Sequence, residues 1–214
     1  MNIKEIKIDK FPLVIITDPH GCYEKVSKVL SLYPEHQIIC LGDVVDLFNK
    51  NKNDSNHKII DLFIDKKIPC ILGNHEQHVL SCSDGNTLRS VKLFGDFGGG
   101  TLTDIDEYDL GQRHIDFLRV LPLGLKLVLP NGHYYYAFHN LPNDLWGQEW
   151  NITKDDFIRH YPINCFVDGI LRGHHHKNQV LEFQGISTKL YGIGALKFGD
   201  YALLNENGIE FKKL

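Results

Sequence analysis

Residues 38–46 read IICLGDVVD, an apolar run that ends at a glycine and is followed by two aspartates. Such a run is typical of a β-strand that is buried on both faces. In an open α/β sheet, ligands bind just beyond the carboxyl ends of the strands, and this is where Asp43 and Asp46 are expected. An ordinary strand-to-loop turn with a capping aspartate would produce the same local pattern. The other strand ends of the chain therefore decide between a site and a turn.

Two further apolar runs end in polar residues of the same kind. Residues 11–17 (FPLVIIT) are followed by Asp18 and His20, and residues 68–72 (IPCIL) are followed by Asn74 and His75. Apolar residues at helical spacing occupy 22–33 and 59–64, between these runs. Strands that alternate with helices predict parallel neighbouring strands in a layered α/β domain.

The second half of the chain predicts more strands. A hairpin is expected from two runs that flank Pro130-Asn131-Gly132, and its second run ends at His139. A later run ends at Arg172, followed by three histidines. The strands predicted for this half, the last four as a β-meander, span residues 123–129, 134–139, 166–171, 179–183, 188–191, 202–204 and 209–211.

Residues 77–121 interrupt the alternation of strands and helices. They carry helical patterns broken by the glycines at 98–100, and we interpret them as a helical insert beside the sheet, with a plain linker as the alternative. No internal repeat or low-complexity tract occurs in the 214 residues. We therefore expect a single domain over residues 1–214.

The composition excludes several classes of protein. A net charge of −4 without a basic stripe disfavours nucleic acid as a partner. No apolar run approaches the roughly 20 residues of a membrane span, and no apolar segment follows Met1–Glu5 as a signal peptide requires. The five cysteines form no C-x-x-C pair, which predicts reduced thiols. We expect a cytoplasmic protein with no membrane partner.

The polar side chains at the strand ends form a set that is typical of metal ligands. One buried histidine is more often a hydrogen-bonded core residue, but here several separate strand ends each supply a carboxylate, an imidazole or an amide. These groups suit a borderline divalent ion such as Mn, Fe or Zn. The set exceeds one tetrahedral site and fits two ions that share a carboxylate, an arrangement that activates water as hydroxide for attack at phosphorus. Its members are Asp18, His20, Asp43, Asn74, His139, His174 and His176.

The motifs D-x-H-G (18–21), G-D-x-x-D (42–46), G-N-H-E (73–76), His139 and G-H-x-H (173–176) occur in this order. Together they resemble the calcineurin-like metallophosphoesterase superfamily. The resemblance implies a four-layer α/β/β/α sandwich of two mixed sheets and a metal-dependent hydrolase that attacks phosphate esters with a metal-bridging hydroxide. It also implies that manganese is the ion best suited to support activity in vitro.

The resemblance also implies roles for single residues. One ion would be held by Asp18, His20, Asp43 and His176, and the other by Asp43, Asn74, His139 and His174. His75, oriented by Asp46, would stabilise the transition state or protonate the leaving oxygen. His175 lies between two of these ligands and is expected to face away from the site.

Residues 18–23 (DPHGCY), residues 73–77 (GNHEQ) and the long segment before His139 resemble the bacterial and phage branch of the serine/threonine protein phosphatases. That branch includes the symmetrical diadenosine tetraphosphatases. The chain departs from its pattern in three places: Leu47 stands where the phosphatases have arginine, Asn140 follows His139, and His176 adds a second histidine.

The missing arginine bears on the substrate, because a bidentate guanidinium grips a phosphomonoester dianion well. Arg172 is a candidate substitute for binding the phosphate, and Arg159 is another. The alternative for Arg172 is an ordinary strand-end residue in a surface ion pair. The expected substrate is a small-molecule or phosphoprotein phosphate ester.

Three functions remain open. The first is a phosphatase-like phosphoesterase. The second is a phosphodiesterase or dinucleoside polyphosphate hydrolase that uses the same ions. The third is a binding module without catalysis, which the complete set of metal ligands disfavours.

Overall fold

The computed structural model describes residues 2–45, 55–84, 109–142, 152–161 and 167–214. Asp46, Leu47 and residues 85–108 of the predicted helical insert, with the glycines at 98–100, lie outside these ranges. The helices are α1 (Tyr23–Leu32), α2 (Asn56–Lys66), α3 (Asn74–Ser83), α5 (Gln112–Arg119), α6 (Lys154–His160) and the 3₁₀ helix η3 (Leu196–Phe198). The strands are β1 (Ile3–Lys7), β2 (Leu13–Ile16), β3 (Ile38–Cys40), β4 (Gly124–Val128), β5 (Tyr134–Phe138), β6 (Gly169–Arg172), β7 (Gln179–Leu181), β8 (Lys189–Gly192), β9 (Asp200–Asn205) and β10 (Gly208–Lys213).

The strands form two mixed sheets. One sheet has the order β1-β4-β5-β6-β8-β7, and the other has the order β10-β9-β2-β3. In the second sheet β2 and β3 are parallel, with Ile16 beside Cys40, so both strands end at the same edge. In the first sheet β5 and β6 are parallel, and Phe138 lies beside Arg172. Within each sheet, the two parallel strands that precede predicted ligands therefore end side by side at the same edge.

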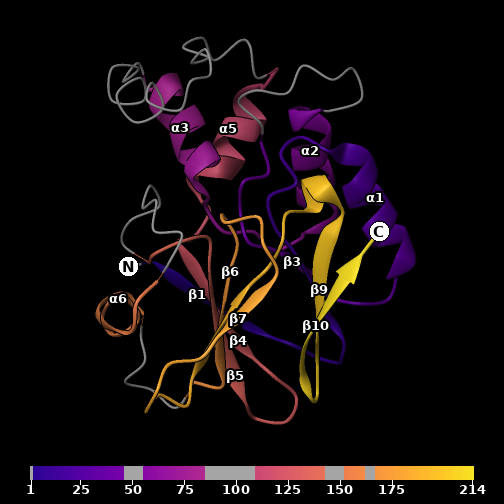
Figure 1. Ribbon diagram of the computed structural model, residues 1–214. Coiled ribbons are helices and arrows are strands. Elements are labelled where there is room, and N and C mark those ends of the chain that lie inside the picture. Colours follow the sequence, from indigo (N-terminus) through magenta and orange to yellow (C-terminus); the bar gives the residue numbers. More distant parts are fainter. Residues whose placement is uncertain (1, 46–54, 85–108, 143–151, 162–166) are drawn as a thin grey trace.

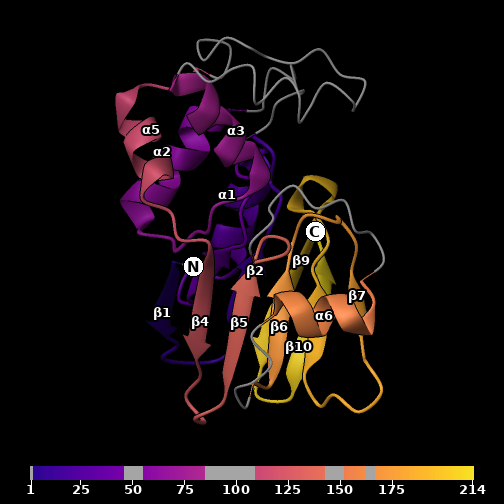
Figure 2. The same cartoon turned by 90° about the vertical axis from the view of Figure 1, so that its left-hand side faces the viewer.

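The two sheets lie face to face between two layers of helices (Figure 1, Figure 2). Helices α1, α2, α3 and α5 gather on the side of the four-stranded sheet, and α6 lies on the outer side of the six-stranded sheet. The side chains of β2 alternate accordingly, because successive residues of a strand face opposite ways. Val14 and Ile16 pack towards the helices, whereas Leu13 and Ile15 pack between the sheets. The predicted four-layer sandwich of two mixed sheets is confirmed.

The sequence patterns were less accurate for the strand expected at 68–72. Only Cys40 and Cys70 form a bridge there. Pro69 has no N–H and cannot donate to a ladder, although its carbonyl accepts from Cys40 at 2.9 Å, and Ile71 donates to Cys40 at 3.1 Å. The segment therefore still runs parallel to β3 and delivers Asn74 to the same edge as Asp43.

The expected C-terminal meander is wrong as a single unit. Strand β8 pairs with β6 and β7 in one sheet, whereas β9 pairs with β2 and β10 in the other. The chain changes sheets at η3. This crossing brings η3 to the end of β2, where Leu196 donates its N–H to Thr17 O at 2.8 Å.

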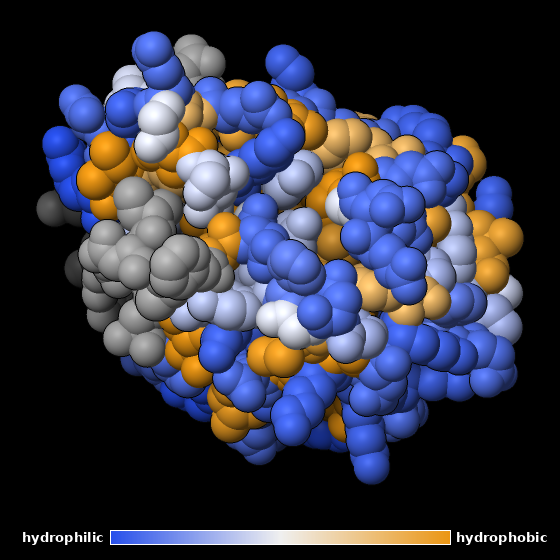
Figure 3. Space-filling model, turned by 90° about the horizontal axis from the view of Figure 1, so that it is seen from below, coloured by the Kyte–Doolittle hydropathy of each residue, from blue (hydrophilic) through white to orange (hydrophobic). Residues whose placement is uncertain are grey.

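Strand β1 was not predicted at all. It lies at the edge of the six-stranded sheet and pairs in parallel with β4. Among the described helices, none is both long and apolar enough to cross a membrane. The end of the sandwich seen from below presents hydrophilic residues interspersed with hydrophobic ones (Figure 3).

Candidate metal centre

The seven predicted ligands converge beyond the carboxyl ends of the strands. Asp18 and His20 follow β2, Asp43 follows β3, Asn74 begins α3, His139 follows β5, and His174 and His176 follow β6. The backbone is left-handed at five of them, with φ of 51° at Asp18, 47° at His20, 52° at Asp43, 67° at His174 and 53° at His176. Such conformations cost about 1–3 kcal/mol each in non-glycine residues and cluster at functional sites. Only two other described non-glycine residues, Lys67 and Asp109, have positive φ.

Four of the predicted ligands form what we call the inner group: Asp43, Asn74, His139 and His174. His139 Nε2 lies 3.1 Å from Asp43 Oδ2 and 2.9 Å from Asn74 Oδ1. His174 Nδ1 also lies 2.9 Å from Asn74 Oδ1. Asp43, Asn74 and His139 are buried. The group therefore brings two nitrogens and two oxygens together, and only His174 among its members is half-buried rather than buried.

A hydrogen bond outside the inner group sets the chemistry of His139. Its Nδ1 lies 2.7 Å from the carbonyl oxygen of Leu41, which can only accept, so Nδ1 donates. This bond leaves Nε2 as the atom that faces Asp43 and Asn74, and a second bond of this kind is what orients a metal-bound histidine. Nε2 and the two oxygens need a positive charge among them, which either a proton on Nε2 or a metal ion can supply. The donor set therefore fits a divalent ion.

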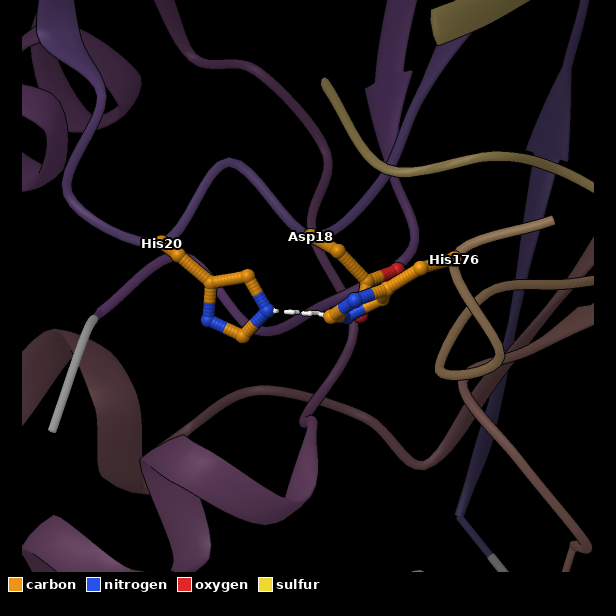
Figure 4. Close-up of side chains that lie close together, drawn as sticks. All are labelled: Asp18, His20 and His176. Carbon is orange, nitrogen blue, oxygen red and sulfur yellow. Dashed lines mark hydrogen bonds and ion pairs between the residues drawn. The ribbon is translucent and has the colours of Figure 1, made fainter. Parts of the chain in front are cut away.

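The other three predicted ligands form what we call the outer group: Asp18, His20 and His176. The rings of His20 and His176 point towards each other beside the Asp18 carboxylate, with their Nε2 atoms 3.0 Å apart (Figure 4). His176 Nε2 lies 3.1 Å from Asp18 Oδ1, and His20 Nε2 lies 3.8 Å from the same oxygen. This carboxylate and two imidazoles form a second donor set.

Asp43 connects the two groups. Its ligand atom lies within 4.8 Å of those of His139 and His174, and also within 4.8 Å of those of His20 and His75. Its other oxygen, Oδ1, accepts the backbone N–H of His75 at 3.0 Å. The carboxylate is thus held between the inner group and the outer group, where a shared ligand has to be.

Electrostatics keep both carboxylates charged. Burial raises the pKa of Asp18, but the hydrogen bond with His176 and the charge of His139 outweigh it and lower the pKa to about 2. Burial also raises the pKa of Asp43, but His139 and His75 bring it well below its usual range. Buried carboxylates that remain ionised are strong ligands for a cation.

The histidines fall into two classes. Burial and the charge of His75 lower the pKa of His20 to about 3, and burial and the charge of His139 lower that of His174 to about 4. Burial lowers the pKa of His139 too, but the charge of Asp43 and the bond to it are stronger and raise it to about 10. The metal-free inner group thus favours positive charge at His139.

His75 lies beside both groups, in the first turn of α3. Its side chain is 13% exposed, its Nε2 lies 3.8 Å from Asp43 Oδ2, and its ring centroid lies 4.6 Å from that of His20. The side chain thus borders the ligands and also reaches solvent. Asp46, its expected orienting partner, lies outside the described residues.

Arg172 is fully buried, so its interpretation as a residue in a surface ion pair is wrong. It occupies the outer face of β6, and its guanidinium bonds to Nδ1 of His175. Burial and the charge of Arg172 lower the pKa of His175 to about 3, which keeps this ring neutral. In this conformation the Arg172 guanidinium does not reach solvent.

Two residues of the site were missed by the sequence analysis. Glu76 is fully buried and accepts backbone N–H groups of the ligand loops. Burial raises its pKa to about 7, and the nearby charge of Asp43 raises it as well. Glu76 stands three residues after Gly73, the N-cap of α3, and a glutamate at this third helical position is a known sequence signal for a helix start. Phe198 packs its ring 5.8 Å from that of His176 and is 57% exposed, and no sequence pattern pointed to it.

Comparisons with known proteins agree with this geometry. The model of calcineurin-like phosphoesterases matches residues 11–178, which include every predicted ligand. No curated protein sequence matches the chain.

Several solved structures share the fold. A metallophosphoesterase from Sphaerobacter thermophilus is 16% identical, with a TM-score of 0.62 over 95% of this chain and 88% of that chain. A candidate diadenosine tetraphosphatase is 15% identical, with a TM-score of 0.59 over 99% and 97% of the two chains. A protein serine/threonine phosphatase from Saccharomyces cerevisiae is 17% identical, with a TM-score of 0.57 over 99% and 84%.

Proposed function

Because the chain belongs to the calcineurin-like phosphoesterase family and is a metal-dependent hydrolase, we propose that it uses two divalent ions to hydrolyse both phosphomonoesters and phosphodiesters. We place it with the bacterial and phage phosphatase-like branch, as its D-P-H-G-C-Y and G-N-H-E-Q motifs suggest. The observation that carries the proposal is the pair of ligand groups joined through Asp43.

The inner group would hold one ion through Asp43, Asn74, His139 and His174. The outer group, with Asp43, would hold the other through Asp18, His20 and His176. When bound, such a pair of ions lowers the pKa of a water molecule and neutralises charge on the phosphoryl oxygens. Manganese is proposed as the ion that supports activity in vitro, since the carboxylate and amide oxygens of the site suit it.

His75 is the proposed proton donor to the leaving oxygen. Its ring borders both ligand groups and is partly exposed, so a bound ester would come within its reach. Asp46 would orient the ring and favour its charged form. Asp43 Oδ1, which accepts the His75 backbone N–H at 3.0 Å, fixes the start of α3 in this position.

We expect only a weak preference between monoesters and diesters, because of where the arginines lie. Leu47 occupies the position at which the resembling phosphatases carry arginine, and Arg172 is buried. Arg113 pairs with Asp61 and Asp65. Among the described residues, neither Arg172 nor Arg113 is placed to present a guanidinium fork to a phosphate, and without such a fork a terminal dianion gains little over a diester monoanion. We expect the two rates to differ by no more than about tenfold, or ~1.4 kcal/mol; Arg172 would bind substrate only after leaving its buried position.

A dinucleoside polyphosphate is the second candidate substrate. Phe198 is a large apolar side chain that stays 57% exposed while its ring contacts the His176 ring. An exposed aromatic face beside a phosphate site can stack on a nucleobase. A phosphoprotein remains within the proposed class. We also propose a cytoplasmic location, since the four described cysteines are free thiols.

The test is a panel of substrates with metal-stripped enzyme reloaded with Mn²⁺, Fe²⁺ or Zn²⁺. The panel compares p-nitrophenyl phosphate, bis-p-nitrophenyl phosphate and diadenosine tetraphosphate. We expect Mn²⁺-dependent hydrolysis of the first two at rates within about tenfold, and Leu47→Arg should favour the monoester. If the wild-type enzyme hydrolyses the monoester thousands of times faster than the diester, another cationic side chain already binds the phosphate. No hydrolysis of any ester with any of the ions would contradict the proposal.

A further inference from the structure

Glu76 is the residue that ties the metal-binding loops together, although no role has been assigned to it so far. We propose that Glu76 is a positioning residue. It holds the loop of residues 42–45, which we call the Asp43 loop, against the start of α3 before a metal ion binds. The inference deepens the proposed metal centre and rests on Asp43 being the ligand shared by both ions.

Within the described residues, the side chain of Glu76 accepts four hydrogen bonds, all from backbone amides. Its Oε1 accepts the N–H of Val44 at 2.7 Å and of Val45 at 3.1 Å. Its Oε2 accepts the N–H of Asp43 at 2.8 Å and of Gly73 at 2.9 Å. The side chain is 0% exposed, so all four bonds lie away from water. Three consecutive N–H groups that converge on one carboxylate form an anion-binding nest filled by the protein itself.

These bonds exceed what a helix cap requires. In a capping box the residue at the third helical position bonds to the N-cap N–H, which here is that of Gly73. The other three bonds reach a loop about thirty residues earlier in the chain. A contact in the reverse direction completes the link, since Asp43 Oδ1 accepts the N–H of His75. The two segments are therefore joined from both sides.

Gly73 shows how closely these groups are packed. A Cβ on this residue would lie 2.2 Å from Asp43 Oδ1 and 2.7 Å from Glu76 Oε2. Both distances are too short for any side chain, so only glycine lets the two carboxylates approach the same backbone segment. Gly73 thus lies against both carboxylates, next to the Asp43 N–H that Glu76 accepts.

The Asp43 loop is also hydrogen-bonded to the turn that carries Asp18 and His20 of the outer group. Its carbonyl oxygens accept N–H groups from the turn after β2: Gly42 O from Asp18 at 3.0 Å, Asp43 O from His20 at 3.0 Å and Val44 O from Gly21 at 2.8 Å. Glu76 binds the amides of the loop whose carbonyls hold Asp18 and His20. Loss of Glu76 should therefore weaken the binding of both ions, although among the predicted ligands it bonds only to the backbone of Asp43.

The first experiment compares Glu76→Gln with a control that also loses a buried hydrogen bond. Glutamine replaces one oxygen by an NH₂ group that cannot accept, so two buried amides lose their acceptor. The control is Thr188→Val, which removes the bond from the buried Thr188 hydroxyl to Val167 O, before β8 begins and away from the ligand-bearing strand ends. The measurement is Mn²⁺ affinity of the metal-stripped proteins by chelator competition, alongside Tm.

We expect Glu76→Gln to bind both ions about 10–100-fold more weakly, the usual loss for a residue that orients ligands. Thr188→Val should lower Tm and leave affinity within about twofold of the wild-type value, well below that range. Wild-type affinity in Glu76→Gln at a lowered Tm would overturn the proposal and make Glu76 a simple cap.

The second experiment needs no variant and decides the matter if Glu76→Gln fails to fold. Amide hydrogen exchange of the metal-free wild-type protein reports the four N–H groups whose acceptor is Glu76. They should exchange as slowly as core amides of β2 and β3. Fast exchange at residues 43, 44, 45 and 73 with a protected core would overturn the proposal. If the wild-type protein binds no divalent ion, the proposed function fails, and this exchange test still separates the two claims.

Discussion

The inner and outer groups differ in how the protein holds them. His139 of the inner group is fully buried, and Leu41 O fixes its ring from outside the group. His176 of the outer group is 33% exposed, and its ring contacts His20, Asp18 and Phe198. A locked, buried ligand loses little freedom when an ion binds, whereas an exposed ligand on a loop loses more. We infer that the inner ion is bound more tightly and is lost last.

Replacing Asp43 removes the feature that the two groups share. Asp43→Asn keeps the shape of the side chain and one acceptor but removes the charge between the ions. We expect turnover to fall to background and both ions to bind more weakly. Elemental analysis and a rate assay of the purified variant check this. Two retained ions with a near-normal rate would contradict the assignment of Asp43 as the shared ligand.

A matched pair of variants separates the two groups. His139→Asn should abolish binding of the inner ion and weaken binding of the outer one as well, because His139 Nε2 lies 3.1 Å from Oδ2 of the shared Asp43. His176→Asn should cost only the outer ion and leave one ion per chain. Calorimetric titration of each variant with Mn²⁺ measures the difference. Equal losses in the two variants would show that the groups do not differ as their burial suggests.

His75 tests whether a residue beside both groups acts on the substrate or on the metal. His75→Asn should slow kcat by ~10²–10⁴, the range for loss of a positioned acid or base, with metal content unchanged. Asp46→Asn should give a smaller loss of the same kind. The ring of His75 lies close enough to His20 and Asp43 to be a ligand itself. Loss of an ion from His75→Asn would establish that role instead.

The pH dependence of metal binding should differ between ligands of the inner group. In the metal-free protein the pKa of His139 is raised to about 10, so this ring carries a proton that the ion must displace. The pKa of His174 is lowered to about 4, so it has no proton to release above pH 5. Affinity for the inner ion should therefore rise with pH, by about tenfold per unit between pH 6 and pH 8. Titrations in buffers of different ionisation enthalpy count the proton, and an affinity that does not change with pH would contradict the assignment.

The candidate ligands could be picked out from the sequence because they follow simple structural rules. Apolar runs marked β2, β3 and β5, and parallel pairing of β2 with β3 brings Asp18 and Asp43 to one edge. Asn74 arrives there although Pro69 prevents a full third strand. Strand β1 escaped detection because Lys4, Glu5 and Lys7 surround isoleucines three residues apart, a pattern that only an edge strand tolerates.

Other features depend on contacts that sequence spacing does not contain. The division of the last four strands between two sheets rests on the pairing of β8 with β6 and of β9 with β2. Arg172 looked like a surface residue because its burial comes from the layers packed around β6. The bonds of Glu76 were invisible because its partners are backbone amides, which every sequence supplies.

The central claim is that two ions share Asp43, and anomalous diffraction from crystals soaked in Mn²⁺ tests it most directly. We predict two anomalous peaks about 3.5–4 Å apart, the usual spacing of such pairs. One should lie among Asp43, Asn74, His139 and His174, and the other among Asp18, His20, Asp43 and His176. A single peak, or two peaks of which only one contacts Asp43, would contradict the account.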